Sequence, residues 1–116
     1  MKYEQIIDDS ILYIKEHINE DLTAQNIANH VGYSVFHFCR IFSLITNLTV
    51  MEYIRKYRLS IARSELEGNK KIIDVALRYG FETASGFTKS FSKEFGYTPT
   101  SYIVRMNNTD STFIKN

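Results

Sequence analysis

The chain has 116 residues, 44% of them hydrophobic and 23% charged, which is typical of one globular domain or two very small ones rather than of a disordered chain. It contains one cysteine, Cys39, and no apolar run of about 18 residues, which excludes an intrachain disulfide, a thiolate-rich zinc site and a membrane-spanning helix. The net charge of +1 is unevenly spread, because residues 1–33 carry two of the 14 basic side chains but six of the 13 acidic ones.

The N-terminal third shows helical spacing of apolar residues. A first helix is predicted from about Tyr3 to Ile18, with Ile6, Ile7, Ile11, Ile14 and Ile18 along it. Thr23 is expected to cap a short helix over 24–30, and Gly32 supplies the positive φ of the turn that follows. Ser34 is expected to cap a helix over about 35–46, which ends at Asn47 and has as its inner stripe Phe38, Ile41, Phe42 and Ile45.

The second half of the chain repeats this kind of pattern. Thr49 and Glu52 form a predicted capping box at the start of a long helix over 50–67, which Gly68 and Asn69 close. A short helix over 72–79 precedes Gly80, and the next helix, over 84–95, is expected to begin at a Thr83 cap, end at Gly96 and turn inward Phe87, Phe91 and Phe95. Thr98 and Pro99 begin a last helix that is expected to end near Met106.

No segment alternates with the period of a strand, so the predicted fold class is all-α, with seven helices. The predicted domains are two helix-turn-helix subdomains, residues 1–48 and 69–106, joined by a long central helix over 49–68. The polar tail, residues 107–116, is expected to fray.

A self-comparison of the sequence reveals one module twice. At an offset of 48 or 49 residues, the matching pairs are Ala28 with Ala76, Gly32 with Gly80, Arg40 with Lys89, Asn47 with Gly96, and Thr49 with Thr98. An alanine therefore stands four residues before a glycine in both copies. Two short helices that cross steeply need a small side chain where they touch, and the turn between them needs a residue free of Cβ strain.

This spacing is typical of a DNA-binding helix-turn-helix, whose second helix enters the major groove. Two hairpins with a purely structural role are the alternative. Their common register and the basic residue at the same position of both second helices, Arg40 and Lys89, favour DNA binding.

Candidate base contacts lie on the face of each second helix opposite its apolar stripe. Arg40 suits a bidentate contact with guanine or a phosphate contact, with a surface salt bridge as the alternative. Phe36 either contacts a thymine methyl or a sugar or packs against a neighbouring helix, and Cys39 is either a weak base contact or a small inert filler. The candidates of the second module are Ser85, Gly86 and Lys89. They are expected to add affinity more than specificity, because lysine lacks the planar fork of arginine.

Candidate phosphate contacts surround these positions. Ser34 and Thr83 stand at helix N-termini, where a hydroxyl and free N–H groups hold phosphate, a role compatible with capping. His37 either faces phosphate or is partly buried. The predicted set is Ser34, His37, Ser43, Arg55, Lys56, Thr83 and Lys93, with a solvated face as the alternative for Arg55 and Lys56. The three histidines and Cys39 lack ligand spacing, so no metal site is predicted.

The long helix sets the expected spacing of the two modules. About 18 residues at about 1.5 Å each span roughly 27 Å, which with the offset of the modules approaches the ~34 Å between successive major-groove faces. A single chain is therefore expected to contact two adjacent groove segments of double-stranded DNA as a monomer.

Several stretches resemble the AraC/XylS family of transcription regulators over about residues 5–105. They are TAQNIANHVGYS at 23–34, FCRIF at 38–42, YIR at 53–55, IDVA at 73–76, YGF at 79–81 and FSKEFGYTP at 91–99, the last two forming the family signature. The resemblance implies two helix-turn-helix units with the third and sixth helices in the major groove. It also implies transcriptional control, commonly activation through contact with RNA polymerase. Base contacts are implied at Phe36, Cys39, Arg40, Ser85, Gly86 and Lys89.

The DNA-binding domain fills the chain, so we expect either a stand-alone regulator of the MarA/SoxS type or a domain cut from a larger regulator. No cofactor and no small-molecule ligand are expected in this chain. Residues 1–10 show no secretory signal, so the expected location is the cytoplasm, at the nucleoid. The alternative function is a helical protein-interaction module that has lost DNA binding. An enzyme is not expected, because His17, His30 and His37 have no nucleophile and oriented base around them.

Overall fold

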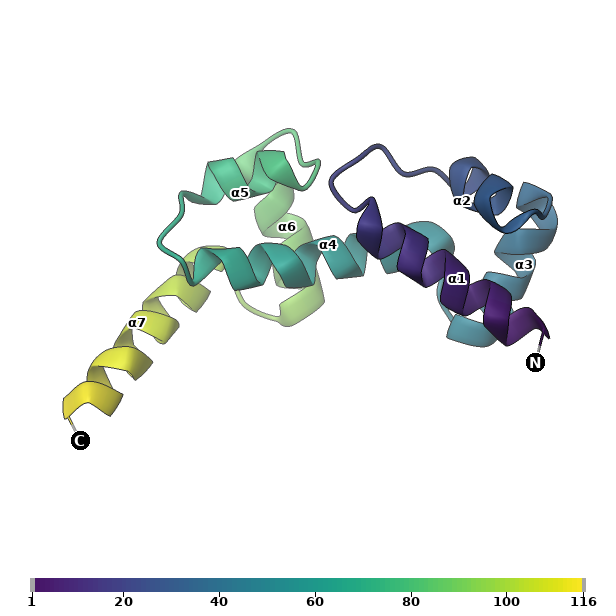
Figure 1. The fold of residues 1–116 in the computed structure, drawn as a ribbon. Coiled ribbons are helices and arrows are strands. Elements are labelled where there is room, and N and C mark those ends of the chain that lie inside the picture. Colours follow the sequence, from purple (N-terminus) through teal and green to yellow (C-terminus); the bar gives the residue numbers. More distant parts are fainter. Residues whose placement is uncertain (1, 116) are drawn as a thin grey trace. The chain divides into compact units, whose positions relative to one another are not determined.

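The computed structural model describes residues 2–115, and the side chains of residues 2–108, as a set of helices (Figure 1). The described residues form seven helices and no strand: α1 (Lys2–Glu16), α2 (Ala24–Val31), α3 (Val35–Thr46), α4 (Val50–Leu66), α5 (Ile72–Arg78), α6 (Ala84–Phe95) and α7 (Pro99–Lys115). The predicted all-α fold class is confirmed. None of these helices is both long and apolar enough to cross a membrane.

Helices α2 and α4 begin at the hydroxyl residues that the sequence predicts as caps. Thr23 Oγ1 accepts a hydrogen bond from the Asn26 N–H at 3.0 Å at the start of α2. At the start of α4, Thr49 Oγ1 accepts from the Glu52 N–H at 3.1 Å, and Glu52 Oε1 accepts from the Thr49 N–H at 2.9 Å. The predicted capping box is therefore present, and the backbone hydrogen bond from Thr49 lowers the pKa of Glu52.

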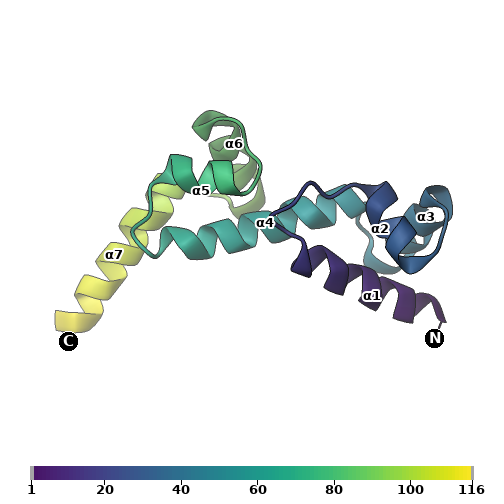
Figure 2. The same ribbon diagram turned by 45° about the horizontal axis from the view of Figure 1, so that its top comes forward.

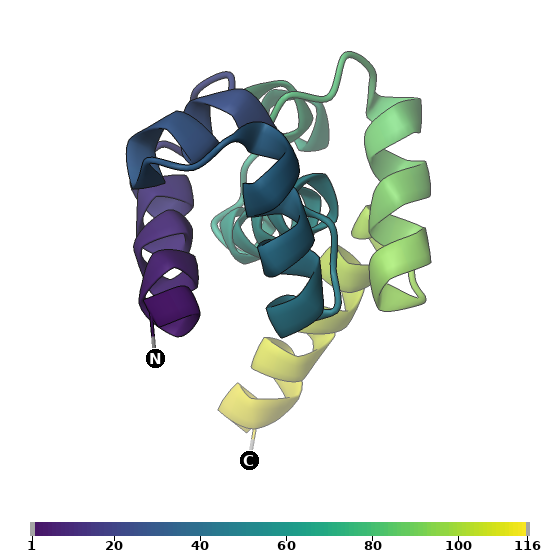
Figure 3. The same cartoon turned by 90° about the vertical axis from the view of Figure 1, so that its right-hand side faces the viewer.

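The chain forms two units that meet within α4: the first ends at Tyr57 and the second begins at Arg58. In the first unit, α2 packs against α1 and α3, and α1 also packs against α3 (Figure 3). The core of this unit is rich in isoleucine and includes Ile7, Ile14, Ile27, Phe38, Ile41, Phe42, Val50 and Ile54.

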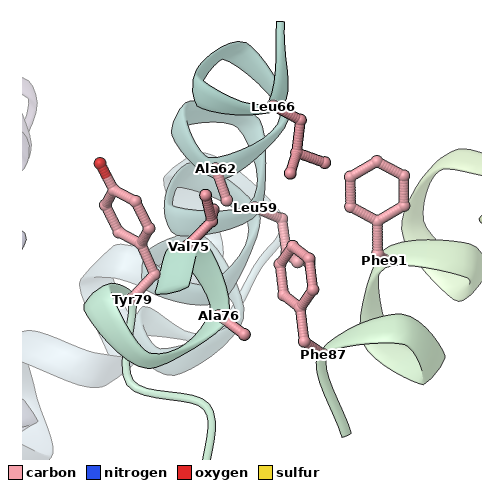
Figure 4. Packing of buried hydrophobic residues seen from close by; sticks show 8 residues of the cluster. All are labelled: Leu59, Ala62, Leu66, Val75, Ala76, Tyr79, Phe87 and Phe91. Atoms are coloured by element: carbon pink, nitrogen blue, oxygen red, sulfur yellow. The ribbon is translucent and has the colours of Figure 1, made fainter. Parts of the chain in front are cut away.

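The core of the second unit brings α4, α5 and α6 together (Figure 4). Its buried residues are Leu59, Ala62, Leu66, Val75, Ala76, Tyr79, Phe87 and Phe91. Phe87 and Phe91 point from α6 towards the leucines of α4, with their ring centroids 5.6 Å apart. The two phenylalanines therefore fix α6 on the rest of its unit.

Arg63 of α4 joins the beginning of α7 to this unit. Its guanidinium lies 4.2 Å from the centroid of the Phe95 ring, and its Nη1 donates to Tyr97 Oη at 2.9 Å. Tyr102 of α7 stacks on Tyr97 and donates a hydrogen bond to Glu67. Burial, together with the carboxylate of Glu67, raises the pKa of Tyr102 to about 12.

Two features differ from the sequence predictions. Ile45, expected in the inner stripe of α3, is 42% exposed, because it lies in the last turn of the helix, where spacing alone does not provide a covering neighbour. The last helix, expected to end near Met106, continues to Lys115, and its C-terminal half extends away from α5 and α6 (Figure 2). No glycine or proline follows Pro99 to stop it. The side chains of the tail beyond residue 108, and residue 116 itself, lie outside the described part.

Candidate nucleic-acid interface

The turns of the two modules have the same backbone geometry. Gly32 has φ +81° and Gly80 has φ +87°, a region that favours glycine. Ala28 and Ala76 are both 0% exposed. In each turn, the carbonyl of the alanine accepts a hydrogen bond at 3.0 Å from the N–H of the residue after the glycine. The predicted repeat is therefore present in the structure, down to the hydrogen bond that closes each turn.

The second helix of each module, α3 or α6, begins and ends in the same way. Ser34 Oγ accepts from the His37 N–H at 3.2 Å, and Thr83 Oγ1 accepts from the Gly86 N–H at 2.9 Å. At the other end, Asn47 and Gly96 are left-handed, with φ +63° and +82°. Both hydroxyl caps are exposed, so a phosphate oxygen has access to the N-terminus of either helix.

On α3, the three predicted base contacts lie along one face of the helix. Phe36 is 76% exposed and Arg40 is exposed, while Cys39 between them is partly buried. A shallow apolar hollow lies over this face, lined by Val35, Phe36, Cys39 and Arg40. Leu44, one turn beyond Arg40, is 74% exposed. Leu44 is not among the predicted contacts, although its spacing of four residues from Arg40 is the signal that places it on this face.

The other predicted contacts of the first unit differ in how available they are. His37 is exposed rather than buried, and its ring lies edge-on to Tyr3 and tilted against Tyr33, with centroids 6.1 and 5.0 Å away. Ser43 Oγ donates to the Leu48 carbonyl at 3.2 Å, so only its lone pairs are left for a ligand. Of the two predicted contacts on α4, Arg55 is exposed and Lys56 is half-buried.

On α6, the equivalent face is polar and carries shorter side chains at its start. Ser85, Lys89 and Lys93 are all exposed. Gly86 is half-buried, and a Cβ built on it would lie 3.2 Å from Thr83 Oγ1, the cap of the same helix. A larger residue at position 86 would therefore press on the cap, which ties this position to local structure as well as to the exposed face.

The basic side chains on the exposed faces of α3 and α6 lack the ion pairs that other basic side chains of the second unit form with Glu65. Glu65 receives hydrogen bonds from Tyr79 and Lys70 and lies 3.6 Å from Arg78 Nη1. Burial raises the pKa of Glu65, but these hydrogen bonds and the two cations outweigh it, so that its pKa lies below the usual value. By contrast, Arg40, Lys89 and Lys93 form no ion pair with any of the described side chains. No group of three metal-ligating side chains is found among the described residues.

The comparisons with known proteins agree with this geometry. A family described as a helix-turn-helix domain matches residues 27–105. The chain is 36% identical over 107 residues to the regulatory protein SoxS of Salmonella typhimurium, covering 91% of this chain and all of SoxS. It is 37% identical over 98 residues to the transposon Tn10 TetD protein of Escherichia coli, covering 84% of this chain and 71% of that protein.

Solved structures show the same fold. An AraC-type transcriptional regulator from Chromobacterium violaceum superposes with a TM-score of 0.85 at 24% identity, covering 89% of this chain and 93% of that one. The DNA-binding domain of AdpA, a global transcriptional factor solved in complex with a target DNA, superposes with a TM-score of 0.80 at 21% identity, covering 89% and 94%. The matched domain and the identity with SoxS over its whole length identify the chain as a member of the AraC/XylS family of sequence-specific DNA-binding transcription regulators.

Proposed function

We propose that the protein binds duplex DNA as a monomer, with α3 and α6 in successive segments of the major groove, and that it activates transcription from the bound site. The observation that carries this proposal is the duplicated turn. The same backbone presents an exposed cation at the same position of the second helix in both modules, Arg40 in one and Lys89 in the other.

In this proposal, α3 is the main reader of sequence. Arg40 donates two hydrogen bonds to guanine, a contact that its planar fork makes well. Phe36 contacts a thymine methyl or a sugar beside it. Cys39, which is smaller and partly buried, lines the hollow between them and adds little discrimination.

The contribution of α6 is chiefly affinity. Ser85 and Gly86 reach only a short distance into a groove, and the ammonium of Lys89 is a point charge without a preferred base geometry. Around both helices, backbone phosphates are held by the capped N-termini at Ser34 and Thr83. The remaining phosphate contacts are His37, Arg55, Lys56 and Lys93. The predicted contact at Ser43 is not retained, because its hydroxyl donates to the Leu48 carbonyl and a phosphodiester offers no proton to its lone pairs.

RNA polymerase is the proposed partner on DNA, and the nucleoid in the cytoplasm is the proposed place of action. SoxS bears the name of a regulatory protein, and this chain aligns with its whole length, which supports a regulatory role for the domain that the two share. We propose that no cofactor and no catalytic step are involved.

The first test is binding to duplex DNA over a series of salt concentrations. Each phosphate neutralised by the protein releases counterions, so the slope of log affinity against log salt is expected to be roughly −5 to −9 for about 6 to 10 phosphates. The matched control is the double variant Arg40→Ala with Lys89→Ala, which should bind more weakly and with a shallower slope. A flat salt response of the parent, with a protein partner captured equally by parent and variant, would instead favour a protein-interaction module.

Selection of bound duplexes from a random pool tests the two-helix arrangement. The expected result is one well-defined group of base pairs and, about one helical turn away, a second group that is less well defined. A single group of preferred base pairs, or two equally sharp groups, would contradict the proposed roles of α3 and α6.

A further inference from the structure

A stripe on α3 combines apolar and basic chemistry in a way that its counterpart on α6 does not. Phe36, Arg40 and Leu44 are spaced by four residues, so they lie one above another on the same side of the helix, and all three are exposed. At the offset of 49 residues, the corresponding side chains of α6 are Ser85, Lys89 and Lys93. An aromatic ring and a leucine thus flank the cation of the first module, where the second has a serine and another lysine.

The apolar side chains of this stripe are not part of the core of their unit. The core residues of α3 are Phe38, Ile41 and Phe42, on the other side of the helix. A surface that met only phosphate would favour a cation at the position of Leu44, as Lys93 provides in the second module. Leucine and phenylalanine gain free energy only where they cover another apolar group.

The edges of bases in the major groove offer one apolar group, the methyl at C5 of thymine. A cytosine methylated at C5 presents the same group at the same ring position. Along α3, Phe36 and Leu44 are each about 6 Å from Arg40, since each residue of a helix rises about 1.5 Å. Base pairs are about 3.4 Å apart, so this distance corresponds to about two base pairs.

We infer that α3 recognises pyrimidine 5-methyl groups, with Phe36 and Leu44 covering methyls on either side of the base pair that Arg40 contacts, and that α6 is indifferent to such methyls. This inference rests on the proposed function and adds a specificity-determining residue, Leu44, to it. It also implies that binding depends on the methylation of cytosine in the part of the site that α3 covers.

The experiment uses a duplex that the protein itself selects from a random pool. Each thymine in turn is replaced by deoxyuridine, which removes only the methyl, and each cytosine by 5-methylcytosine, which adds only a methyl. Loss of a covered methyl is expected to weaken binding about fourfold, from about 0.8 kcal/mol per buried methylene-sized group. The effect is expected at thymines near the base pair contacted by Arg40 and nowhere in the half of the site that α6 covers.

Matched variants assign each methyl to a side chain. Phe36→Ala and Leu44→Ala should each abolish the effect of deoxyuridine at one position and leave it intact at the other. Leu12→Ala, which alters a leucine of α1 that is 58% exposed, should leave the effect intact at both.

The outcomes separate this inference from the function on which it rests. If the parent binds its selected duplex but neither deoxyuridine nor 5-methylcytosine changes affinity in the α3 half, the inference is overturned and the proposed function stands. A selected duplex that lacks thymine throughout the α3 half also overturns it. If the parent binds no duplex, the proposed function itself fails.

Discussion

The two helix-turn-helix modules share a backbone and differ in the chemistry of the face they present. Both turns contain a buried alanine, a glycine with φ above +80° and the same closing hydrogen bond. Yet the exposed stripe of α3 carries an aromatic ring, a guanidinium and a leucine, and that of α6 a hydroxyl and two ammonium groups. A few small residues therefore maintain the backbone of each turn. The exposed positions of α3 and α6 can differ in sequence without destabilising that backbone.

The cores of the two units also differ. The first unit is packed largely with isoleucine, and its Phe42 has two aromatic neighbours, Phe38 and Tyr53, at 5.7 Å each. The second is packed around Phe91, whose ring centroid lies 4.7–6.3 Å from those of four other rings. Edge-to-face pairs of this kind add about 0.5–1.5 kcal/mol beyond the burial of their area.

The largest expected effect comes from truncating the two equivalent core phenylalanines, Phe42 and Phe91. Phe42→Ala and Phe91→Ala should each lower the free energy of unfolding by about 3–5 kcal/mol, and Phe91→Ala should cost more because it loses more ring contacts. Urea unfolding followed by circular dichroism measures both values. Phe42→Leu and Phe91→Leu, which keep most of the volume, preserve the ranking if an alanine variant does not fold. A larger loss at position 42 would contradict the difference between the cores.

The next effect concerns the two equivalent cations. Arg40→Ala is expected to weaken binding to the preferred duplex by about 1–3 kcal/mol and to relax the preference at one base pair. Lys89→Ala should weaken binding equally for all duplex sequences. It should also reduce the slope of log affinity against log salt by about 1.

Affinities measured for the preferred duplex and for duplexes with single base-pair changes distinguish the two patterns. Arg40→Lys is the sharpest control, because it keeps the charge and removes the fork. If Arg40→Lys retained the base preference of the parent, Arg40 would be a phosphate contact and not a base reader.

The helix boundaries and the turns were largely predictable from the sequence, because they depend on residues close together in the chain. Thr23, Ser34 and Thr83 cap their helices through hydrogen bonds that span three residues, and Gly32 marks its turn by its own conformational freedom. The repeat then extended each of these predictions to the other module. The spacing of polar residues likewise identified the exposed face of α3, including Arg40.

Other features depend on contacts that spacing does not encode. Ile45 continues the apolar stripe of α3 in sequence but is not covered in the structure. Leu44 was not predicted to be exposed, because leucine is more often a core residue than a surface one. Ser43 looked like a free hydroxyl until the structure showed its hydrogen bond to the Leu48 carbonyl, a group that follows the end of the helix.

The smallest expected effect is on the free energy of unfolding, when Ser43 and its equivalent at the offset of 49 residues, Ser92, are each replaced by alanine. The Ser92 Oγ is buried without a hydrogen-bond partner among the described residues, whereas the Ser43 Oγ donates to the Leu48 carbonyl. Ser43→Ala loses a hydrogen bond worth about 0.5–1.5 kcal/mol, while Ser92→Ala removes a hydroxyl whose burial is uncompensated and should stabilise the protein by about 1 kcal/mol.

Because alanine also favours a helix over serine, the exposed Ser64→Ala in α4 calibrates that contribution. Relative to Ser64→Ala, urea unfolding should then give changes of opposite sign at positions 43 and 92. Equal changes at the two positions would mean that the hydroxyl of Ser92 has found a partner, such as a water molecule, and that the two modules are more alike at this point than their side-chain contacts indicate.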